Sequence, residues 1–522
     1  MQGNKIKMSE AEETATRGWW ETRWFLLALP LLAALPLLLP SLPPLIDLPG
    51  HTGRYKIAMD LADSPTLQAF YAFRWALVPN LGADLLVMPL AALFGLEPAV
   101  KIVALLIPAL TMTGFLWVAK EAHGRVPASV LFAAPLIYGF PFLYGFLNFT
   151  LAVALAFLAL GLWMRLGRLG RWPLRAALFV PISFIVWVSH AFGWGMLGLL
   201  AFGVELARQL DGEPRVPKAV WRAGLHMLPL AAPLLPMLIW QGTTPANAHD
   251  WLNLPWKLLA LLWLLRDRWQ WFDAASVAML LAVLVLAWRD KRVEASRALL
   301  MPALILFAAF LLLPRLFLGG AHNDNRLLPY AVAVALLALR PAAEASRRFA
   351  AGFALAALAF FTVRMTGVAA SAFLYGQSFT AEAAAIERLP KGARVAAFVN
   401  IGCFDEWTRP RLDHLPSLAI VRREAFVNDQ WTVAGSHLLT VKPPYGAYID
   451  PSQMVAEPEC KEHLLNPALA AISPALFDHV WLIQPPSYDP VLTRGWTPVW
   501  RRGGSVLFRL PAPPPAPAVT LP

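Results

Sequence analysis

The chain has 522 residues, of which 58% are hydrophobic and 15% are charged, and its mean hydropathy is +0.54. Soluble domains are about 45–50% apolar and about 25% charged, so this composition excludes an ordinary soluble protein and indicates an integral membrane protein. The net charge of +11 does not indicate a nucleic-acid partner, because the lysines and arginines stand mainly in short loops between apolar runs. Loops of that kind set membrane topology by the positive-inside rule.

Apolar runs that approach the roughly 20 residues of a membrane-spanning helix recur as far as residue 370. We expect about eleven spans, at 24–43, 99–119, 126–146, 149–165, 174–189, 191–207, 221–240, 272–288, 298–318, 326–340 and 349–369. If segment 1–23 is cytoplasmic, every dense basic loop faces inward. We therefore predict a cytoplasmic N-terminus and a transmembrane domain over 24–370.

Two apolar stretches do not fit this alternation. Residues 80–96 hold only a short continuous apolar run, and counting them as a span would place the basic loop at 165–175 outside. We expect an interfacial helix there, within a first outer loop over 44–98. Residues 255–269 mix tryptophans with basic side chains, which is also typical of a helix lying on the headgroups.

From residue 371 the chain is less apolar, with short strand-like runs between turn signals. We expect strands at 394–399, 418–421, 437–441, 480–483 and 505–510. They predict an α/β domain over 371–510, outside the membrane on the side of residue 47, followed by a disordered Pro-rich tail over 511–522. The two cysteines of the chain, Cys403 and Cys460, both fall in this domain. They form either a disulfide or two free thiols.

The first candidate for chemistry follows the first apolar run. Pro49 suits the first turn of a helix, and Asp47 just before it favours the N-terminus of that helix. Helical spacing brings His51 and Arg54 to one face, with Lys56 nearby. The cluster is either a helix-start acid with solvated basic neighbours, or a base for an acceptor hydroxyl with cations for a phosphate.

Two further outward segments carry polar groups. Glu97 stands before a proline where the interfacial helix meets the second span, and a solvated turn is its alternative. The loop at 319–329 holds His322, Asp324 and Asn325, which could bind a sugar or a metal, with a solvated loop as the alternative for each. It also holds Arg326, whose fork suits a lipid-linked phosphate or snorkels at the interface. Weaker candidates, each with an ordinary interface role as its alternative, are His190, His249, Asp250 and Arg364.

Together these features resemble the GT-C superfamily, membrane glycosyltransferases that use polyprenyl-phosphate sugars, such as protein O-mannosyltransferases and aminoarabinose transferases. The resemblance rests on Asp47 after the first span, Glu97 in Phe-Gly-Leu-Glu before the second, and Arg326 in Arg-Leu-Leu-Pro at a late span. It implies that Asp47 is the general base, that Glu97 is the second acid of the first loop, and that Arg326 contacts the donor phosphate. Leu48 replaces the second acid of the family's commoner acidic pair, so we expect no metal and no other cofactor.

The resemblance implies an inverting glycosyltransferase in a bacterial inner membrane, acting on an extracytoplasmic glycan, lipid or protein acceptor. Two alternatives stay open: a non-catalytic membrane component of envelope polysaccharide assembly, and a lipid or solute transporter. Transporters usually carry intramembrane acids and an internal repeat, and the spans of this sequence are nearly free of acids. Proximity of Asp47, Glu97 and Arg326 at one outward cavity would favour the enzyme.

Overall fold

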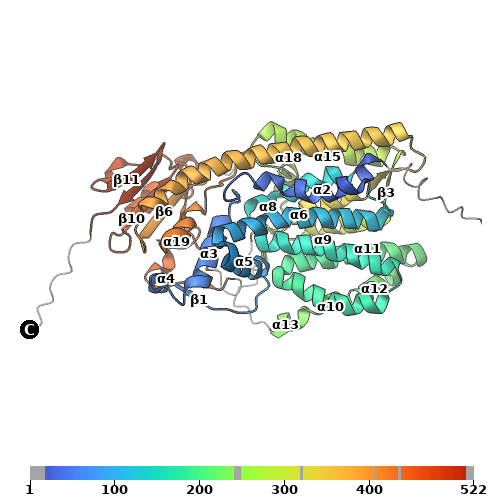
Figure 1. The fold of residues 1–522 in the computed structure, drawn as a ribbon, viewed down its shortest axis with the longest axis horizontal. Helices are drawn as coiled ribbons and strands as arrows, with labels where there is room; N and C mark the ends of the chain where they lie inside the picture. The colour runs from blue at the N-terminus through green and yellow to red at the C-terminus, as the bar shows by residue number, and fades with distance from the viewer. Residues whose placement is uncertain (1–17, 240–247, 318–320, 404–405, 433–436, 513–522) are drawn as a thin grey trace, which may run out of the picture.

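The computed structural model describes residues 18–239, 248–317, 321–403, 406–432 and 437–512. A long helical bundle makes up one end of the molecule and a domain built on a β-sheet makes up the other (Figure 1). The predicted N-terminal segment and Pro-rich tail fall largely outside the described residues. The expectation of a helical membrane protein with a C-terminal sheet domain is confirmed.

Six helices among the described residues are long and apolar enough to cross a membrane. They are α6 (Leu96–His123), α9 (Leu147–Arg168), α10 (Trp172–Ser189), α11 (Ala191–Gly212), α15 (Gln270–Arg289) and α18 (Arg347–Ala383). The basic loops between them gather at the end of the bundle away from the sheet, where β3 (Val293–Ala295) pairs with β5 (Leu339–Pro341) (Figure 1). That grouping is the one the positive-inside rule predicts.

The five other predicted spans are shorter or broken helices, so the count of eleven is not reached by length alone. Prolines break 126–146 and 221–240 into short pieces, because proline removes a backbone donor and clashes with the preceding turn. The short helices are α2 (Arg23–Ala34), α7 (Val130–Ala133), α8 (Phe140–Tyr144), α12 (Val216–His226), α13 (Leu234–Ile239), α16 (Arg297–Leu312) and α17 (Leu328–Leu337).

The helices pack closely where glycine removes the side chain. Helices α6 and α9 cross at Gly114, and α11 crosses α16 at Gly203. A Cβ on Gly203 would lie 2.5 Å from the Cα of Pro302, far inside van der Waals contact. Such close approach of backbones is typical of helix packing in membranes, where small residues line the interfaces.

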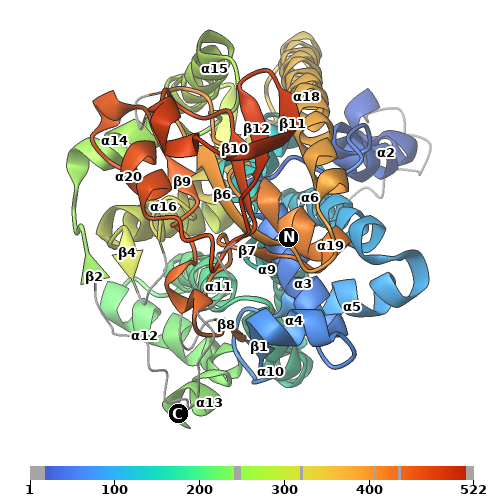
Figure 2. The ribbon, with the colours of Figure 1, turned by 90° about the vertical axis from the view of Figure 1, so that its left-hand side faces the viewer.

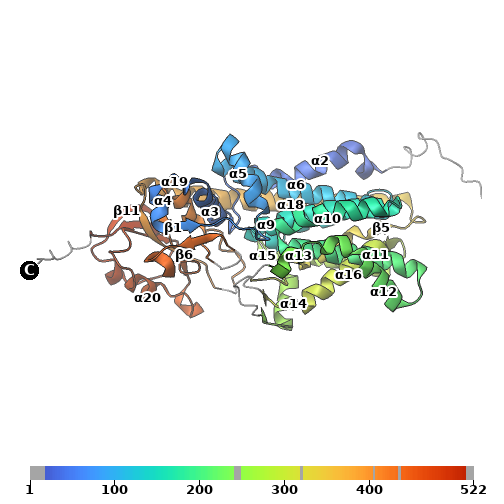
Figure 3. The ribbon, with the colours of Figure 1, turned by 90° about the horizontal axis from the view of Figure 1, so that it is seen from below.

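The first outer loop forms a compact unit at the sheet end of the bundle. It contains α3 (Leu48–Asp60), α4 (Pro65–Phe70), β1 (Tyr71–Phe73) and α5 (Gly82–Phe94), so the stretch expected at 80–96 is a short helix. The stretch at 255–269 begins as α14 (Leu254–Leu262), which lies at the boundary between the bundle and the sheet domain (Figure 3). The two-residue strands β2 (Ala248–His249) and β4 (Leu316–Phe317) pair beside it.

The sheet domain lies across one end of the bundle (Figure 2). Its strand order is β11-β12-β10-β6-β7, with β9 also on β6; β6 and β10 are parallel, and β12 runs antiparallel to both β10 and β11. The strands are β6 (Arg394–Asn400), β7 (Phe426–Val427), β9 (Met454–Val455), β10 (His479–Ile483), β11 (Thr497–Arg502) and β12 (Ser505–Arg509). Helix α20 (Leu465–Ala470) precedes β10, and β8 (Leu439–Val441) pairs with β1 instead, which ties this domain to the first outer loop.

Two expectations about this domain need correction. Residues 418–421, expected as a strand, form α19 (Leu418–Arg423), whose apolar residues are buried next to α3 and whose end is set by Glu424 in a left-handed conformation. Helix α18 runs unbroken through residue 371, so the change in composition there marks where the helix leaves the bundle, and the first strand of the sheet begins at Arg394.

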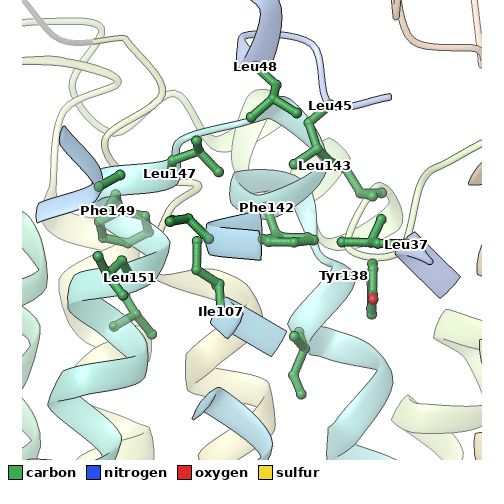
Figure 4. Packing of buried hydrophobic residues seen from close by; sticks show 14 of the residues in the cluster. Leu37, Leu45, Leu48, Ile107, Tyr138, Phe142, Leu143, Leu147, Phe149 and Leu151 are labelled. Atoms are coloured by element: carbon green, nitrogen blue, oxygen red, sulfur yellow. The ribbon is translucent and has the colours of Figure 1, made fainter. Parts of the chain in front are cut away.

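A buried apolar layer supports the start of α3 (Figure 4). Leu45 and Leu48, on either side of Asp47, are fully buried and belong to one cluster with Leu143 and Leu147 of the neighbouring loop. Burial of each such side chain contributes roughly 1.5–3 kcal/mol relative to exposure. The position of Asp47 is therefore fixed by packing on both sides.

The Gly203 contact generates a stability prediction with a control on the same helix. Gly203→Ala should destabilise the protein by about 1–3 kcal/mol, because the added methyl group has no room against Pro302. Gly198→Ala on α11 adds the same group into open space and should leave stability unchanged or slightly raised. Thermal unfolding in detergent compares the two, and equal melting temperatures would refute the predicted packing of α11 on α16.

Candidate functional site

Asp47 is the N-cap residue of α3, and backbone contacts hold it in place. Its N–H donates to the carbonyl of Tyr144 at 2.9 Å, and its own carbonyl accepts from the N–H of His51 at 3.0 Å. The opposing loop turns at Gly145, which has a φ of +97°. A Cβ at this position would lie 2.8 Å from the backbone nitrogen of Asp47, so both the backbone conformation and the close contact require glycine. Asp47 therefore lies against the Tyr144–Gly145 turn.

The carboxyl group of Asp47 is buried without a hydrogen-bond donor among the described residues. Asp47 is only 8% exposed. Burial raises its pKa to about 8, partly opposed by the positive charges of His414 and Arg326. A carboxylate with a pKa near the working pH is well suited to accept a proton, since it is ionised in a useful fraction and still basic. This environment, rather than the sequence motif alone, makes Asp47 a candidate base.

The sheet domain surrounds this carboxyl group with charged residues that the sequence analysis did not select. His414 donates from Nδ1 to the carbonyl of Asp429 at 3.0 Å, and its Nε2 lies 3.8 Å from Asp450. Burial would lower the pKa of His414, but Asp413, Asp450 and Asp47 raise it to about 9. His414 is thus an imidazolium at neutral pH and partly offsets the negative charge of this acid cluster.

The first turn of α3 packs directly on this group. A Cβ on Gly50 would lie 3.3 Å from the ring of His414 and 2.6 Å from that of Trp431. The side chain of Gln430 donates to the carbonyl of Gly50 at 3.2 Å. Asp47 and the sheet-domain cluster are therefore parts of one packed unit.

A cavity of about 680 Å³ opens beside this unit, between the bundle and the sheet domain. Its bundle side is mainly aromatic, and both walls carry charged groups. Apolar walls with a few polar groups are the usual character of a small-molecule site. The lining includes Phe140, Tyr144, Trp256, Trp263, Arg266, Arg315, His322, Asn325, Arg409, Asp413, Glu459, Glu462 and His463.

Two of the predicted substrate-binding residues lie at or next to this cavity. His322 lines it, and burial together with Arg315, Arg326 and Arg409 lowers its pKa to about 3, so it is a neutral imidazole. The guanidinium of Arg326 lies over the ring of Phe146 at 4.2 Å and donates to the carbonyl of Ala321 at 3.2 Å. Burial lowers the pKa of Arg326 to about 10, with the charge of Asp47 opposing.

The other predicted substrate ligands are engaged elsewhere. Arg54 forms a buried ion pair with Asp84 of α5 at 2.8 Å, and Lys56 pairs with Asp60 one turn along α3. Asp324 forms a buried ion pair with Lys257 at 2.9 Å. None of these three side chains lines the cavity. His51 lies nearer the site, with its ring 5.1 Å from that of Trp431 and its buried Nδ1 without a partner.

Glu97 lies apart from Asp47. It begins α6 and accepts two hydrogen bonds from Arg422 of α19, at 2.8 and 2.9 Å. Glu97 neither lines the cavity nor contributes to the pKa of Asp47. Its contact therefore joins the bundle to the sheet domain, and a catalytic role for Glu97 stays a prediction without support from this geometry.

The weaker candidates have ordinary partners. His190 accepts the N–H of Phe192 and a long contact from Arg326 at 3.4 Å. Arg364, which is buried, forms an ion pair with Asp273. Asp250 lies 3.8 Å from Arg315, and His249 lies in β2. Cys403 and Cys460 are joined by a disulfide that forms part of the cavity wall.

The functional residues missed from the sequence come mostly from one segment. Residues 406–414 run from the disulfide loop to the acid cluster and supply Arg409, Arg411, Asp413 and His414. Four ionisable groups within six residues, in a domain expected only to cover the site, were a signal that could have selected them. Their position opposite Asp47 could not be inferred, because it depends on how the two halves of the chain pack.

No protein-family model matches the chain, and no curated protein matches it significantly. Three solved structures are similar in fold. ArnT from Cupriavidus metallidurans bound to undecaprenyl phosphate is 12% identical, with a TM-score of 0.49 over 93% of this chain and 97% of that one. Its apo form is 14% identical, with a TM-score of 0.48 over 96% and 98%.

The third structure is arabinofuranosyltransferase AftD from Mycobacteria, 16% identical with a TM-score of 0.47. The match covers 94% of this chain and 40% of AftD. At identities this low and TM-scores below 0.5, the function has to be argued from the site itself.

The Arg54–Asp84 pair generates a prediction that separates folding from binding. Arg54→Met leaves the buried Asp84 carboxylate without its cation and should cost about 3–5 kcal/mol of stability. Adding Asp84→Leu should restore much of that loss. Lys56→Met on the same helix removes a partly exposed pair worth about 0–1 kcal/mol and is the control. Thermal unfolding measures all four proteins; an Arg54→Met variant that keeps its stability and loses only substrate affinity would make Arg54 a ligand.

Proposed function

We propose that this protein is a glycosyltransferase that moves a sugar from a polyprenyl-phosphate donor to a hydroxyl group of an acceptor outside the cytoplasm. The observation that carries the proposal is the buried Asp47 carboxyl group, which has no donor among the described residues and a pKa of about 8, and which packs against Tyr144, a residue of a cavity wall that also contains arginines. A base and cations for a leaving phosphate are the two requirements of this reaction.

In this reaction Asp47 takes the proton of the acceptor hydroxyl as its oxygen attacks the anomeric carbon of the sugar. The bond between that carbon and the phosphate oxygen breaks, and the electron pair leaves with the polyprenyl phosphate. Arg326 neutralises the charge that develops on the phosphate. Attack from the face opposite the leaving group inverts the anomeric configuration. His414 favours the ionised form of Asp47 before each turnover.

The aromatic side chains and the disulfide around the cavity fit the same proposal. Aromatic rings such as Tyr144 and Trp256 offer faces to a sugar ring, and the tethered loop at Cys403 and Cys460 limits access of water. A non-catalytic envelope component would not need a desolvated carboxylate, whose ionised form is costly to bury. For a transporter, we find no specific observation in its favour.

We also propose the orientation and location of the protein. The basic loops at the end of the bundle away from the sheet favour a cytoplasmic position for that end, which places the cavity and the sheet domain outside. A polyprenyl-phosphate donor of this class fits the inner membrane of a bacterium. The alternative orientation predicts protease access to the sheet domain only from the cytoplasmic side.

The proposal predicts that Asp47→Asn abolishes transfer without unfolding the protein. The amide keeps the shape of the side chain and cannot take a proton, so transfer should fall by at least about 10²–10⁴-fold. Asp60→Asn, at the other end of α3, is the matched control and should keep wild-type activity. Transfer from an undecaprenyl-phosphate sugar is measured with membranes or purified protein. Wild-type turnover by Asp47→Asn would remove Asp47 from the mechanism.

The raised pKa of Asp47 predicts the pH profile. Because the base must be ionised, kcat/KM should rise with pH and level off above about pH 8. His414→Gln removes the positive charge that lowers the pKa of Asp47, so the rise should move to higher pH. Profiles of the wild type and this variant test both statements. A wild-type profile that is already flat from pH 5 upward would show that Asp47 does not titrate as proposed.

A further inference from the structure

Arg409 is a buried guanidinium that the protein leaves largely without partners. It lies on segment 406–414 of the sheet domain, is 8% exposed and lines the cavity. Its one hydrogen bond within the described residues runs from Nε to the carbonyl of Arg266, at 3.3 Å. Its Nη2 is buried and has no acceptor among the residues that the structure describes. Such a group costs free energy unless an anion is supplied from elsewhere.

Arg411, two residues further on, shows what a structural arginine looks like in the same segment. Its Nη1 donates to the carbonyls of Pro44 and Leu143, both at 2.9 Å. Its Nη2 binds the carboxylate of Asp267 at 2.6 Å. This ion pair engages Asp267, whose negative charge also acts on the pKa of Arg409. Within the described residues, Arg411 therefore has three hydrogen bonds and a carboxylate partner, with its Nε left over, whereas Arg409 has one hydrogen bond and no carboxylate partner.

The surroundings of Arg409 add positive charge. Arg266 donates to the backbone carbonyls of Glu406 and of Trp407, the latter at 2.7 Å, and forms no ion pair with a carboxylate of the described residues. Arg315 also lines the cavity, with a long ion pair to Asp250 at 3.8 Å. Burial and the charges of Arg266 and Arg411 lower the pKa of Arg409 to about 9, so it is still a cation at neutral pH.

Arg409 and Arg326 differ in their relation to the cavity. Arg409 lines it from the sheet-domain side, with its guanidinium over the ring of Phe140 at 5.0 Å. Arg326 is not among the lining residues, and its guanidinium lies over the ring of Phe146 at 4.2 Å. Arg409 is therefore a cationic position of the cavity itself, distinct from Arg326.

We propose that Arg409, together with Arg315, forms an oxyanion subsite that binds a phosphate group carried by a substrate of this cavity. A guanidinium fork matches phosphate oxygens, and a partly desolvated site strengthens each charge-assisted hydrogen bond. The sheet domain then takes part in substrate binding. This proposal rests on the proposed function, which supplies substrates that carry a phosphate. Binding of phosphate to the subsite can be measured without turnover. The phosphate belongs either to the polyprenyl-phosphate donor or to the acceptor.

The experiment measures binding to the full chain in lipid nanodiscs. Undecaprenyl phosphate is titrated, with tryptophan fluorescence as the readout because Trp256 and Trp263 line the cavity. Inorganic phosphate is titrated separately into protein saturated with undecaprenyl phosphate. The variants are Arg409→Gln, Arg409→Lys and the control Arg422→Gln, which removes the same charge from the partly exposed pair with Glu97.

Arg409→Gln should weaken one of the two titrations roughly ten- to hundredfold, and Arg409→Lys should weaken it less because the charge remains. Weaker undecaprenyl phosphate binding assigns the subsite to the donor. Weaker inorganic phosphate binding, with undecaprenyl phosphate binding intact, assigns it to the acceptor. Arg422→Gln should change neither titration.

Thermal stability gives an independent readout. Because Arg409 is buried without a counter-ion in the described part of the chain, Arg409→Gln should unfold at the same temperature as the wild type or higher in the absence of ligand. A structural arginine would instead lose stability on substitution. Unchanged affinity in both titrations, or a loss of stability with unchanged affinity, would overturn the proposal. Inactivity of Asp47→Asn together with unchanged binding by Arg409→Gln would leave the proposed function standing and remove only this subsite.

Discussion

Arg411 joins the two halves of this protein. One guanidinium binds the backbone carbonyls of Pro44 and Leu143, and also the carboxylate of Asp267. Pro44 lies three residues before Asp47. Leu143 lies in α8 next to Tyr144, whose carbonyl accepts the N–H of Asp47. The contact therefore fixes segment 406–414 of the sheet domain against the loop that carries the candidate base. Both the burial of Asp47 and the closure of the cavity depend on it.

The consequence of that closure is electrostatic. Asp47, Asp413 and Asp450 come together with His414 in a buried region, where charges interact more strongly than in water. Asp413 of this cluster lines the cavity together with Arg266, Arg315 and Arg409. An acceptor hydroxyl and a phosphate placed between them would each meet the group it needs. Neither half of the chain contains this arrangement alone, since Asp47 comes from the first outer loop and His414 and Arg409 come from the sheet domain.

The sequence was sufficient for the parts of this arrangement that depend on local chemistry. The helix start at Asp47 follows from an acid before proline, and the position of Arg326 just ahead of α17 follows from a polar loop at the edge of an apolar run. The parts that depend on long-range packing could not be predicted. Arg54 and Asp324 have the right chemistry for a ligand, but Asp84 and Lys257, distant in sequence, bind them. The count of about eleven spans is not confirmed for a related reason, because prolines break several apolar runs that packing still buries.

The central claim is that the base acts on the acceptor and the phosphate-binding arginines act on the donor phosphate at one site between the bundle and the sheet domain. The most direct measurement is an experimental structure of the full chain in a lipid nanodisc with undecaprenyl phosphate bound. The account predicts the phosphate in this cavity, in contact with an arginine of the set Arg326, Arg409 and Arg315, on the side that faces Asp47. A phosphate bound outside the cavity, for example at Glu97 and Arg422 or among the basic loops at the opposite end of the bundle, would contradict it.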